Sequence, residues 1–434
     1  MTNSDTKNFS QNVSSSYYLE DRGKCNKNTC ANTRNVPKLR FKGYNDEWKK
    51  IKLKDICIDF IVPMRDKPKE FNGNIPWCRI EDIEGNYFNG TKSNQYVSQE
   101  TIDKMNLKII PTGSVICSCS ASLGTYAINT CPIITNQTFI GLVCSEKISN
   151  HFLLNLMNTQ TRKLKIIAGG TTIPYISREK FEEYNVKIPS LPEQEKIASF
   201  LTLIDKKIEK QKELVELLKK YKRGLLSAIF SKKMRFKDDN GNNYPAWEEK
   251  SLGEVTGNIS YGLNAASKDY DGENKYIRIT DIDETTGKYN NLDIVSPDCV
   301  LSDDYKLKIN DLLFARTGAS TGKTYLYNEN DGKMYFAGFL IKFSIKNEYC
   351  SNFIFYITQT FYYKKWVSIM SARSGQPGIN AKEYSNYKFS CPVYDEQVKI
   401  SNIVSQLDNI IEKENILLDS YNDYKKGLLQ KMFI

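Results

Sequence analysis

Histidine is almost absent from this sequence, because His151 is the only one among 434 residues. That scarcity excludes Ser-His-Asp triads, histidine-rich zinc sites and most histidine acid–base chemistry, unless His151 itself is the catalyst. His151 opens an apolar stretch that reaches Met157 and that we expect to be helical. A surface or cap position is therefore the favoured interpretation of this residue.

Long apolar runs and a cysteine framework are also lacking. No run approaches the ~18 apolar residues that a membrane span needs, and the first residues are polar without a signal-peptide core. We therefore expect a soluble, cytoplasmic protein that makes no membrane contact. The 11 cysteines are scattered, which suits reduced thiols. Neither Cys25 with Cys30 nor Cys117 with Cys119 has a partner pair at zinc-finger spacing, so no metal site is predicted.

An internal repeat dominates what is present. The segment PSLPEQEKIASFLTLIDKKIEK, from Pro189, aligns without a gap with PVYDEQVKISNIVSQLDNIIEK, from Pro392, at an offset of 203 residues. Weaker matches extend the repeat towards the N-terminus, such as Leu39–Lys42 with Met234–Lys237. Two copies of one unit therefore fill the chain from about residue 36 onwards. The preceding Asn-, Ser- and Lys-rich tail, residues 1–35, is expected to be disordered.

Each copy has two parts. The first part, which we call a head, has short apolar runs between turn residues and is typical of a mixed α/β domain. The second part predicts one long helix, from near Pro192 to about Phe230 and again from about Asp395 to Phe433. The predicted fold is therefore α/β (α+β), with two similar mixed heads separated by two long antiparallel coiled-coil helices in a pseudo-two-fold repeat. The predicted domains are a first head at 36–190, a first helix at 191–236, a second head at 237–393 and a second helix at 394–434.

Heptad spacing predicts that the two long helices pack against each other. In the first helix the predicted seam residues are Ile197, Phe200, Ile204, Gln211, Leu214, Leu218, Tyr221 and Leu225. In the second helix they are Ile400, Ile403, Leu407, Ile410, Glu414, Leu417, Tyr421, Tyr424 and Leu428. The first helix ends where the second head begins, and the second helix begins where that head ends, so the helices must be antiparallel. We predict that Gln211 and Glu414, the polar members of the seam, meet and help to fix the register.

The motifs that resemble enzyme sites are all incomplete. Gly318–Thr324 resembles a P-loop but has three residues between its glycines where the motif needs four. Tyr175 follows Ile-Pro, a string that lacks the amide or acid of an amino-methyltransferase site. Asp298 and Asp304 resemble a nuclease metal site that the first copy lacks. These incomplete motifs favour binding over catalysis. Two similar heads suit a DNA duplex with two half-sites, and the net charge of +10 over the whole chain fits contact with phosphates.

This duplicated plan resembles the specificity subunit of type I restriction–modification systems, over about residues 36 to 434. The motifs that carry the resemblance are Leu39–Phe41, Ile80–Ile83, Ile173-Pro174, Pro192–Ile197, Lys222–Leu226 and Thr317–Ser320. The resemblance implies that each head is a target recognition domain for one half of a bipartite, asymmetric DNA sequence, and that the helices set the gap between the halves. It also implies two methyltransferase (modification) subunits that methylate adenine with S-adenosylmethionine, and motor-nuclease (restriction) subunits that use ATP and Mg. Those cofactors would bind the partners, and this chain would hold none and catalyse nothing.

Candidate DNA contacts are basic and polar side chains of glycine-rich loops, which can hydrogen-bond base edges or phosphates. In the first head they are Arg65, Lys67, Arg79, Ser118, Ser120, Ser122, Thr171, Thr172 and Tyr175. In the second head they are Arg278, Arg316, Thr317, Ser320, Lys323, Arg373, Ser374 and Gln376.

Two points about these candidates stay open. Arg79 and Arg278 recur in both copies, either as phosphate contacts or in structural ion pairs with Asp82 and Asp281. The first head has Ser118-Cys119-Ser120 where the second has Arg316-Thr317-Gly318, which puts contacts from this loop of the first head in doubt. The alternatives for the whole chain are a stand-alone bipartite DNA-binding protein, or a nuclease or methyltransferase with an unrecognised site.

Overall fold

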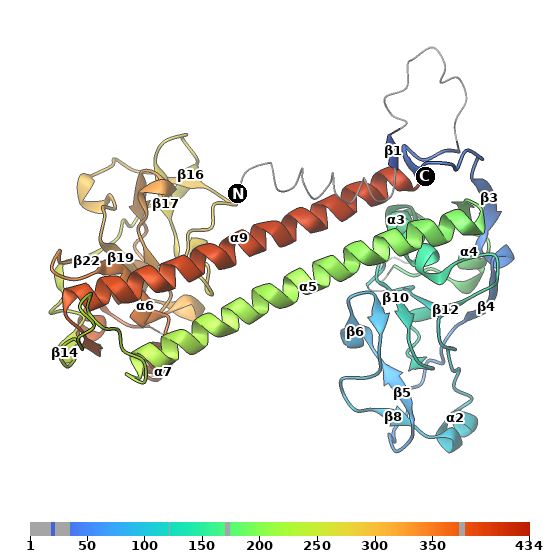
Figure 1. Ribbon diagram of the computed structural model, residues 1–434, viewed down its shortest axis with the longest axis horizontal. Coiled ribbons are helices and arrows are strands. Elements are labelled where there is room, and N and C mark those ends of the chain that lie inside the picture. Colours follow the sequence, from blue (N-terminus) through green and yellow to red (C-terminus); the bar gives the residue numbers. More distant parts are fainter. Residues whose placement is uncertain (1–18, 22–34, 121, 170–173, 373–377) are drawn as a thin grey trace, which may run out of the picture. The chain divides into compact units, whose positions relative to one another are not determined.

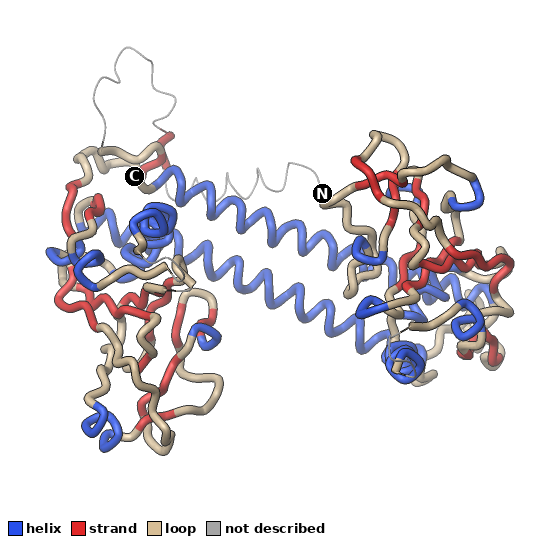
Figure 2. Tube along the Cα trace, turned by 180° about the vertical axis from the view of Figure 1, so that it is seen from behind, coloured by secondary structure: helices blue, strands red, loops and turns tan. Residues whose placement is uncertain are grey.

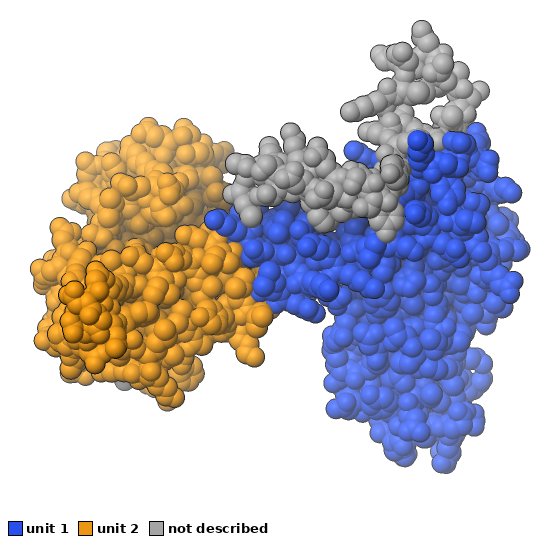
Figure 3. Space-filling model, viewed as in Figure 1, with its two compact units in different colours: residues 1–214, 413–434 blue, residues 215–412 orange. Residues whose placement is uncertain are grey.

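The chain divides into two compact units (Figure 3). The computed structural model describes residues 19–21, 35–120, 122–169, 174–372 and 378–434. Unit 1 comprises residues 1–214 and 413–434, and unit 2 comprises residues 215–412. Each unit therefore holds one head and a part of each long helix, α5 (Leu191–Phe230) and α9 (Tyr394–Met432). Most of the predicted tail lies outside the described residues, and Leu19–Asp21 within it form strand β1, which pairs with β2 (Leu39–Phe41).

The first head is built on a six-stranded sheet in the order β4-β12-β9-β10-β7-β6 (Figure 1). These strands are β4 (Cys57–Ile61), β12 (Phe139–Cys144), β9 (Val115–Ser118), β10 (Tyr126–Asn129), β7 (Tyr87–Phe88) and β6 (Ile83–Glu84). Neighbouring strands are antiparallel, except for the parallel pair β10 and β7. Smaller sheets are formed by β11 (Ile134–Thr135), β5 (Ile75–Cys78) and β8 (Tyr96–Val97), and by β13 (Asn185–Ile188) with β3 (Lys49–Lys52).

The second head repeats the central part of this sheet with four antiparallel strands in the order β15-β22-β19-β20. These strands are β15 (Thr256–Tyr261), β22 (Leu340–Ile345), β19 (Asp311–Ala315) and β20 (Thr324–Leu326). The remaining pairs are β16 (Ser267–Asp269) with β18 (Val295–Pro297), β17 (Lys275–Ile277) with β21 (Met334–Phe336), and β14 (Glu248–Ser251) with β23 (Lys388–Cys391). The shared order β4-β12-β9-β10 and β15-β22-β19-β20 shows the repeat at the level of topology.

Shorter helices complete the heads, with several single 3-10 turns between strands (Figure 2). They are α2 (Gln99–Met105), α3 (Asn150–Ile167) and α4 (Arg178–Glu182) in unit 1, and α6 (Ser351–Thr358), α7 (Phe361–Ser371) and α8 (Ala381–Ser385) in unit 2. The 3-10 turns are η2 (Leu53–Asp55), η3 (Ile80–Asp82), η4 (Ile279–Asp281), η5 (Asp303–Tyr305), η6 (Gly318–Ser320) and η7 (Glu329–Asp331). The apolar stretch that begins at His151 is helical, as predicted, and Phe152, Leu153 and Leu156 in it are completely buried.

Within each unit the parts of α5 and α9 lie against each other and run antiparallel. In unit 1 Asp205 pairs with Lys425, and Gln211 pairs with Glu414, so residue numbers rise along one helix as they fall along the other. Of the predicted seam, the residues of one heptad set are buried or half-buried. They are Ile197, Ile204, Gln211, Leu218 and Leu225 in α5, and Ile400, Leu407, Glu414, Tyr421 and Leu428 in α9.

Four residues of the other predicted heptad set do not lie in the seam. Leu214 and Tyr221 in α5, and Ile403 and Ile410 in α9, are exposed. One position further along the chain, a heptad set of buried or half-buried residues completes the seam: Leu201, Ile208, Val215, Lys222 and Ile229 in α5 and Val404, Ile411, Leu418, Lys425 and Met432 in α9. Phe200 is buried, but by the head, because its ring packs edge-on against Phe41 at 5.6 Å. Leu417 and Tyr424 of the predicted set are half-buried.

The predicted polar contact in the seam is confirmed. The side-chain amide of Gln211 donates to the carboxylate of Glu414 at 2.6 Å and to its backbone carbonyl at 3.1 Å. Gln211 is buried, so a shift of one helix turn would leave its amide without these acceptors. Both residues belong to unit 1, where this contact specifies the register of α5 and α9.

Candidate nucleic-acid interface

An arginine–glutamate pair, fully buried in unit 1 and partly buried in unit 2, fastens each head to the start of a long helix. In unit 1 the guanidinium of Arg40, in β2, donates twice to Glu193 in the first turn of α5, with both bonds 2.7 Å long. In unit 2 Arg235 donates to Glu396 in the first turn of α9 at 2.8 and 2.7 Å. Bidentate, charge-assisted bonds fix orientation as well as distance. The Glu of the repeated Glu-Gln motif is therefore an anchor for the head.

The glutamine that follows this glutamate anchors a second element. The side-chain oxygen of Gln194 accepts the backbone N–H of Ser149, immediately before α3, at 3.0 Å. Gln397 accepts the equivalent N–H of Cys350, before α6, at 2.9 Å. An otherwise free donor at the start of each head helix is thus satisfied by the long helix. The motif that recurs at an offset of 203 residues has the same structural role in both units.

An aromatic cluster ties the other end of a long helix to each head. In unit 1 the ring of Phe433, just after α9, lies 6.0 Å from Trp48 and 5.3 Å from Phe152. In unit 2 Phe230, at the end of α5, lies 6.3 Å from Trp247 and 5.4 Å from Phe353. Each head is therefore packed on the beginning of one long helix and on the end of the other.

On this support, each head brings together two of the loops that carry the candidate DNA contacts. In the first head the backbone N–H of Ile176, next to Tyr175, donates to the carbonyl of Cys119 at 2.9 Å. In the second head Ile379 donates to Arg316 at 2.9 Å, and Thr317 forms a bridge with Gly378. The candidates Thr171, Thr172, Arg373, Ser374 and Gln376 lie outside the described residues.

The strand register corrects the alignment of the two loops by one residue. Cys119 donates its N–H to Thr138, and Arg316 donates its N–H to Phe339, at the same place on the neighbouring strand. Cys119 is therefore the counterpart of Arg316, whereas the predicted counterpart of Arg316 was Ser118. Four residues lie between Cys119 and the turn glycine Gly124, and five lie between Arg316 and Gly322, so the second head has one extra residue in this loop.

Arg316 is held in place by an aromatic ring. Its guanidinium carbon lies 5.1 Å from the centre of the Tyr261 ring, and the Tyr261 hydroxyl accepts the backbone N–H of Ala381 at 3.2 Å. A guanidinium over an aromatic face keeps its donors in the plane free to bind an acceptor outside the protein. Sequence reasoning missed Tyr261, which lies at the end of β15, on the strand that flanks β22.

The other described candidates differ in exposure. Arg65, Lys67, Ser122 and Tyr175 are exposed, and Lys67 lies 5.5 Å from the Phe71 ring. Ser120, Thr317, Ser320 and Lys323 are half-buried, and the Lys323 ammonium lies 3.8 Å from Glu284. Ser118 is buried at the end of β9, where its hydroxyl donates to the carbonyl of Ser120 at 3.1 Å.

The two recurrent arginines have different partners. Arg278 binds Asp281 through two nitrogens, at 2.9 and 2.8 Å, and also reaches Asp293 at 3.0 Å. The hydrogen bonds to these carboxylates, first of all to Asp281, raise the pKa of Arg278 above its usual value. The side chain of Arg79 instead donates to Gln95 at 2.6 Å, and Asp82 accepts its backbone N–H at 2.7 Å. The predicted alternative of an ion pair with the aspartate is therefore present at Arg278.

His151 lies in the first turn of α3, half-buried, with its ring 6.0 Å from that of Tyr87. Burial lowers the pKa of its imidazole. Among the described residues, no three His, Cys, Asp or Glu side chains come together as metal ligands. None of the helices in the described part of the chain has the length and apolar character to cross a membrane.

Two stretches of the chain, residues 45–219 and 244–419, match the family described as type I restriction modification DNA specificity domain. A specificity subunit of the MjaIX type I restriction enzyme of Methanocaldococcus jannaschii is 28% identical over 53% of this chain, and the match spans 56% of that relative. The StySPI specificity subunit of Salmonella potsdam is 25% identical over 83% of this chain and 81% of its own length. The crystal structure of the S subunit from M. genitalium shares the fold, with a TM-score of 0.58 at 18% identity, over 92% of this chain and 99% of that one.

Proposed function

The chain belongs to the type I restriction–modification DNA specificity family, and we propose that its heads read the two halves of a bipartite, asymmetric DNA target. The family match occurs twice, once over each head and the helix that follows it. A duplicated reader fits a target with two half-sites, and sequence differences between the heads make those half-sites different. The long helices would set the unspecified gap between them.

One observation supports the proposal most directly, namely the pair of joined loops at the same place in each head. These loops offer different chemistry, because Arg316 over Tyr261 in the second head has Cys119 as its counterpart in the first. A fixed arginine is suited to the O6 and N7 acceptors of guanine in the major groove, whereas a cysteine is a poor donor. We therefore propose a guanine contact from Arg316 in the half-site of the second head only.

The partners proposed for this chain are two modification subunits and the motor-nuclease subunits. The relatives are called specificity subunits of type I restriction enzymes, and one solved structure of the same fold concerns complex assembly of such a system, at a TM-score of 0.54. The partners would supply adenine methylation from S-adenosylmethionine and cleavage driven by ATP with Mg. This chain would choose the site without catalysing either reaction.

A selection from a duplex library with a long randomised region tests the proposal. The purified chain together with its modification subunits should enrich two short motifs at a constant separation. Arg316→Ala should weaken binding by about 1–3 kcal/mol and relax one motif while the other stays intact. Equal loss in both motifs would contradict the assignment, and enrichment of a single continuous motif would contradict the two-headed reading. Lys67→Ala, in the first head, is the matched control and should leave the motif of the second head unchanged.

A further inference from the structure

Two aspartates at equivalent positions of the repeat each join three elements of their own unit. In unit 2 one carboxylate oxygen of Asp408, on α9, lies 2.6 Å from the ammonium of Lys222, on α5. The other oxygen accepts the hydroxyl of Tyr356, on α6 in the head, at 3.1 Å. The Lys222 ammonium also donates to Gln359, just after α6, at 2.8 Å. The two long helices and the head are therefore joined through one carboxylate and one ammonium.

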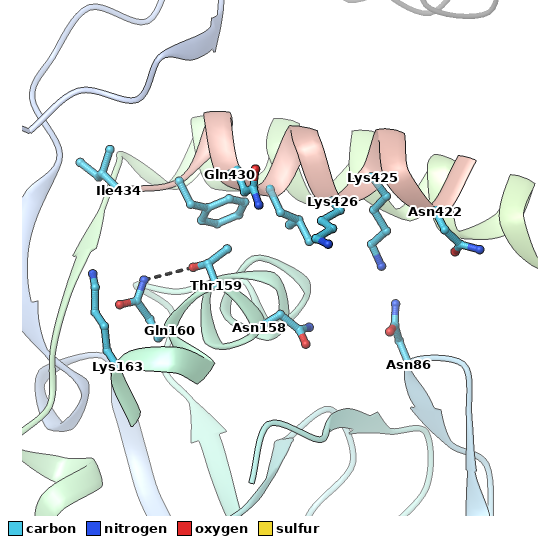
Figure 4. Close-up of a pocket in the computed structure, with 12 residues that line it drawn as sticks. Asn86, Asn158, Thr159, Gln160, Lys163, Asn422, Lys425, Lys426, Gln430 and Ile434 are labelled. Carbon is cyan, nitrogen blue, oxygen red and sulfur yellow. Dashed lines mark hydrogen bonds between the residues drawn. The ribbon is translucent and has the colours of Figure 1, made fainter. Parts of the chain in front are cut away.

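The same arrangement recurs in unit 1 with a different donor from the head. One oxygen of Asp205, on α5, lies 2.5 Å from the ammonium of Lys425, on α9. The other oxygen accepts the side-chain amide of Asn86, just before β7, at 2.8 Å. Figure 4 shows Asn86 and Lys425 pointing towards each other from the head and from the helix. In each unit, then, one oxygen bonds the other long helix and the second oxygen bonds the head.

These junctions differ from ordinary surface ion pairs in their burial. The side chains are only 13% and 23% exposed for Lys222 and Asp408, and 19% and 22% for Lys425 and Asp205. An exposed pair contributes little, because water screens it and competes for its hydrogen bonds. A carboxylate held from two directions at a half-buried position also restricts rotation, since turning the head breaks one bond and leaves a half-buried carboxylate oxygen without a donor.

Rotation of a head matters for reading a two-part target. Adding one base pair to the gap moves a half-site by ~3.4 Å and turns it by about 35° around the duplex, given 10–10.5 base pairs per turn. A head that could turn on its helices would follow such a shift at little cost. A head that is held from two sides would lose its contacts, and the target with the altered gap would be rejected.

We propose that these two junctions, Asp408 with Lys222 and Tyr356, and Asp205 with Lys425 and Asn86, are positioning devices that make the chain discriminate between gap lengths. This inference rests on the proposed function and deepens it. It assigns the choice of gap to the attachment of each head as well as to the length of the helices. None of these residues needs to touch DNA.

Two variants loosen the junction of unit 2 in different ways. Tyr356→Phe removes the bond from the head to Asp408 and keeps the buried ring, the Lys222–Asp408 pair and the bond from Lys222 to Gln359. Lys222→Met removes the ammonium and keeps the apolar stem. Lys219→Met is the matched control, because it changes a lysine on the same helix whose ammonium pairs with the nearby Glu216, at 2.9 Å, on the same helix.

The readout is the length of the gap in methylated targets. The full chain or a variant, assembled with modification subunits, is incubated with S-adenosylmethionine and genomic DNA that lacks this methylation, and every methylated adenine is mapped. The original protein and Lys219→Met should methylate one two-part motif with a single gap. Tyr356→Phe and Lys222→Met should also methylate targets whose gap differs by one base pair, with discrimination between gaps about tenfold smaller, or ~1.4 kcal/mol.

Two results would overturn the inference. If both variants methylate only the original gap, even at a reduced rate, the junctions stabilise the fold without selecting the gap. If the original protein yields no two-part motif, the proposed function fails and this inference fails with it. The two failures are distinguishable, because the first leaves the motif of the original protein intact.

Discussion

Replacing Glu193 by Gln should destabilise unit 1 strongly. Arg40 and Glu193 are 2% and 1% exposed, and the two bonds of 2.7 Å between them neutralise a charge that water cannot reach. The amide keeps the size of the side chain but leaves the guanidinium charged and buried, with one acceptor in place of two. Breaking a buried pair in this way costs about 3–5 kcal/mol. The contact between the first head and the N-terminal end of α5 should therefore open before the rest of the chain unfolds.

Hydrogen exchange measured by mass spectrometry can locate this effect, because the two units need not unfold together. Peptides from β2, α3 and the start of α5 should lose protection in Glu193→Gln, while peptides from the second head keep theirs. Glu249→Gln is the control, since Glu249 and its partner Lys388 are both about two-thirds exposed, and it should change nothing measurable. A loss of less than about 1 kcal/mol in Glu193→Gln, or an equal loss in both units, would refute the reasoning.

Three further predictions concern two glycines and the histidine. Gly322→Ala should destabilise unit 2 by about 1–3 kcal/mol in chemical denaturation, because the added carbon would lie 2.4 Å from Val367 at a backbone φ of +88°. Gly224→Ala, in α5, should instead stabilise the fold by about 1 kcal/mol, since the added carbon meets nothing within 4 Å. A loss of stability in this variant would contradict the open space next to Gly224. Burial holds the pKa of His151 below its ordinary value of 6.5, so the neutral ring is favoured in the folded protein. The contribution of the neutral His151 ring to stability is complete above pH 6.5 and falls as the pH drops through the lowered pKa. His151→Gln should therefore make the melting temperature depend less on pH below pH 6.5. An unchanged dependence of the melting temperature on pH would show that His151 is not responsible.

The repeat made much of the fold predictable, but the packing seam shows where the sequence was insufficient. The offset of 203 residues locates both long helices without any structure. From the sequence, the seam could pass through Phe200 or Leu201, because both residues are apolar. Burial does not distinguish them either, since both are completely buried in the structure. The head covers Phe200, whose ring packs against Phe41, and this leaves Leu201 as the buried residue at that position of the seam. A head that covers one side of a helix widens its apolar stripe and hides the narrower seam.

The candidate site was predictable as a set of loops and much less so residue by residue. A loop one residue longer in the second head moves the counterpart of Arg316 from Ser118 to Cys119, and strand hydrogen bonds alone reveal it. The pair of Arg40 with Glu193 spans 153 residues and was also missed. Its signal was present, since both residues recur in the second copy as Arg235 and Glu396. Residues that recur together in both copies are candidates for contact with each other.

A map of methylated adenines in cells with and without this gene tests the central claim most directly. If the chain selects the DNA site for its partners, one two-part motif with a constant gap should be methylated only when the gene is present. Restoring the gene with Arg316→Ala should bring back methylation with one half of the motif relaxed. An unchanged set of methylated adenines after deletion of the gene, with the modification subunits still expressed, would contradict the account.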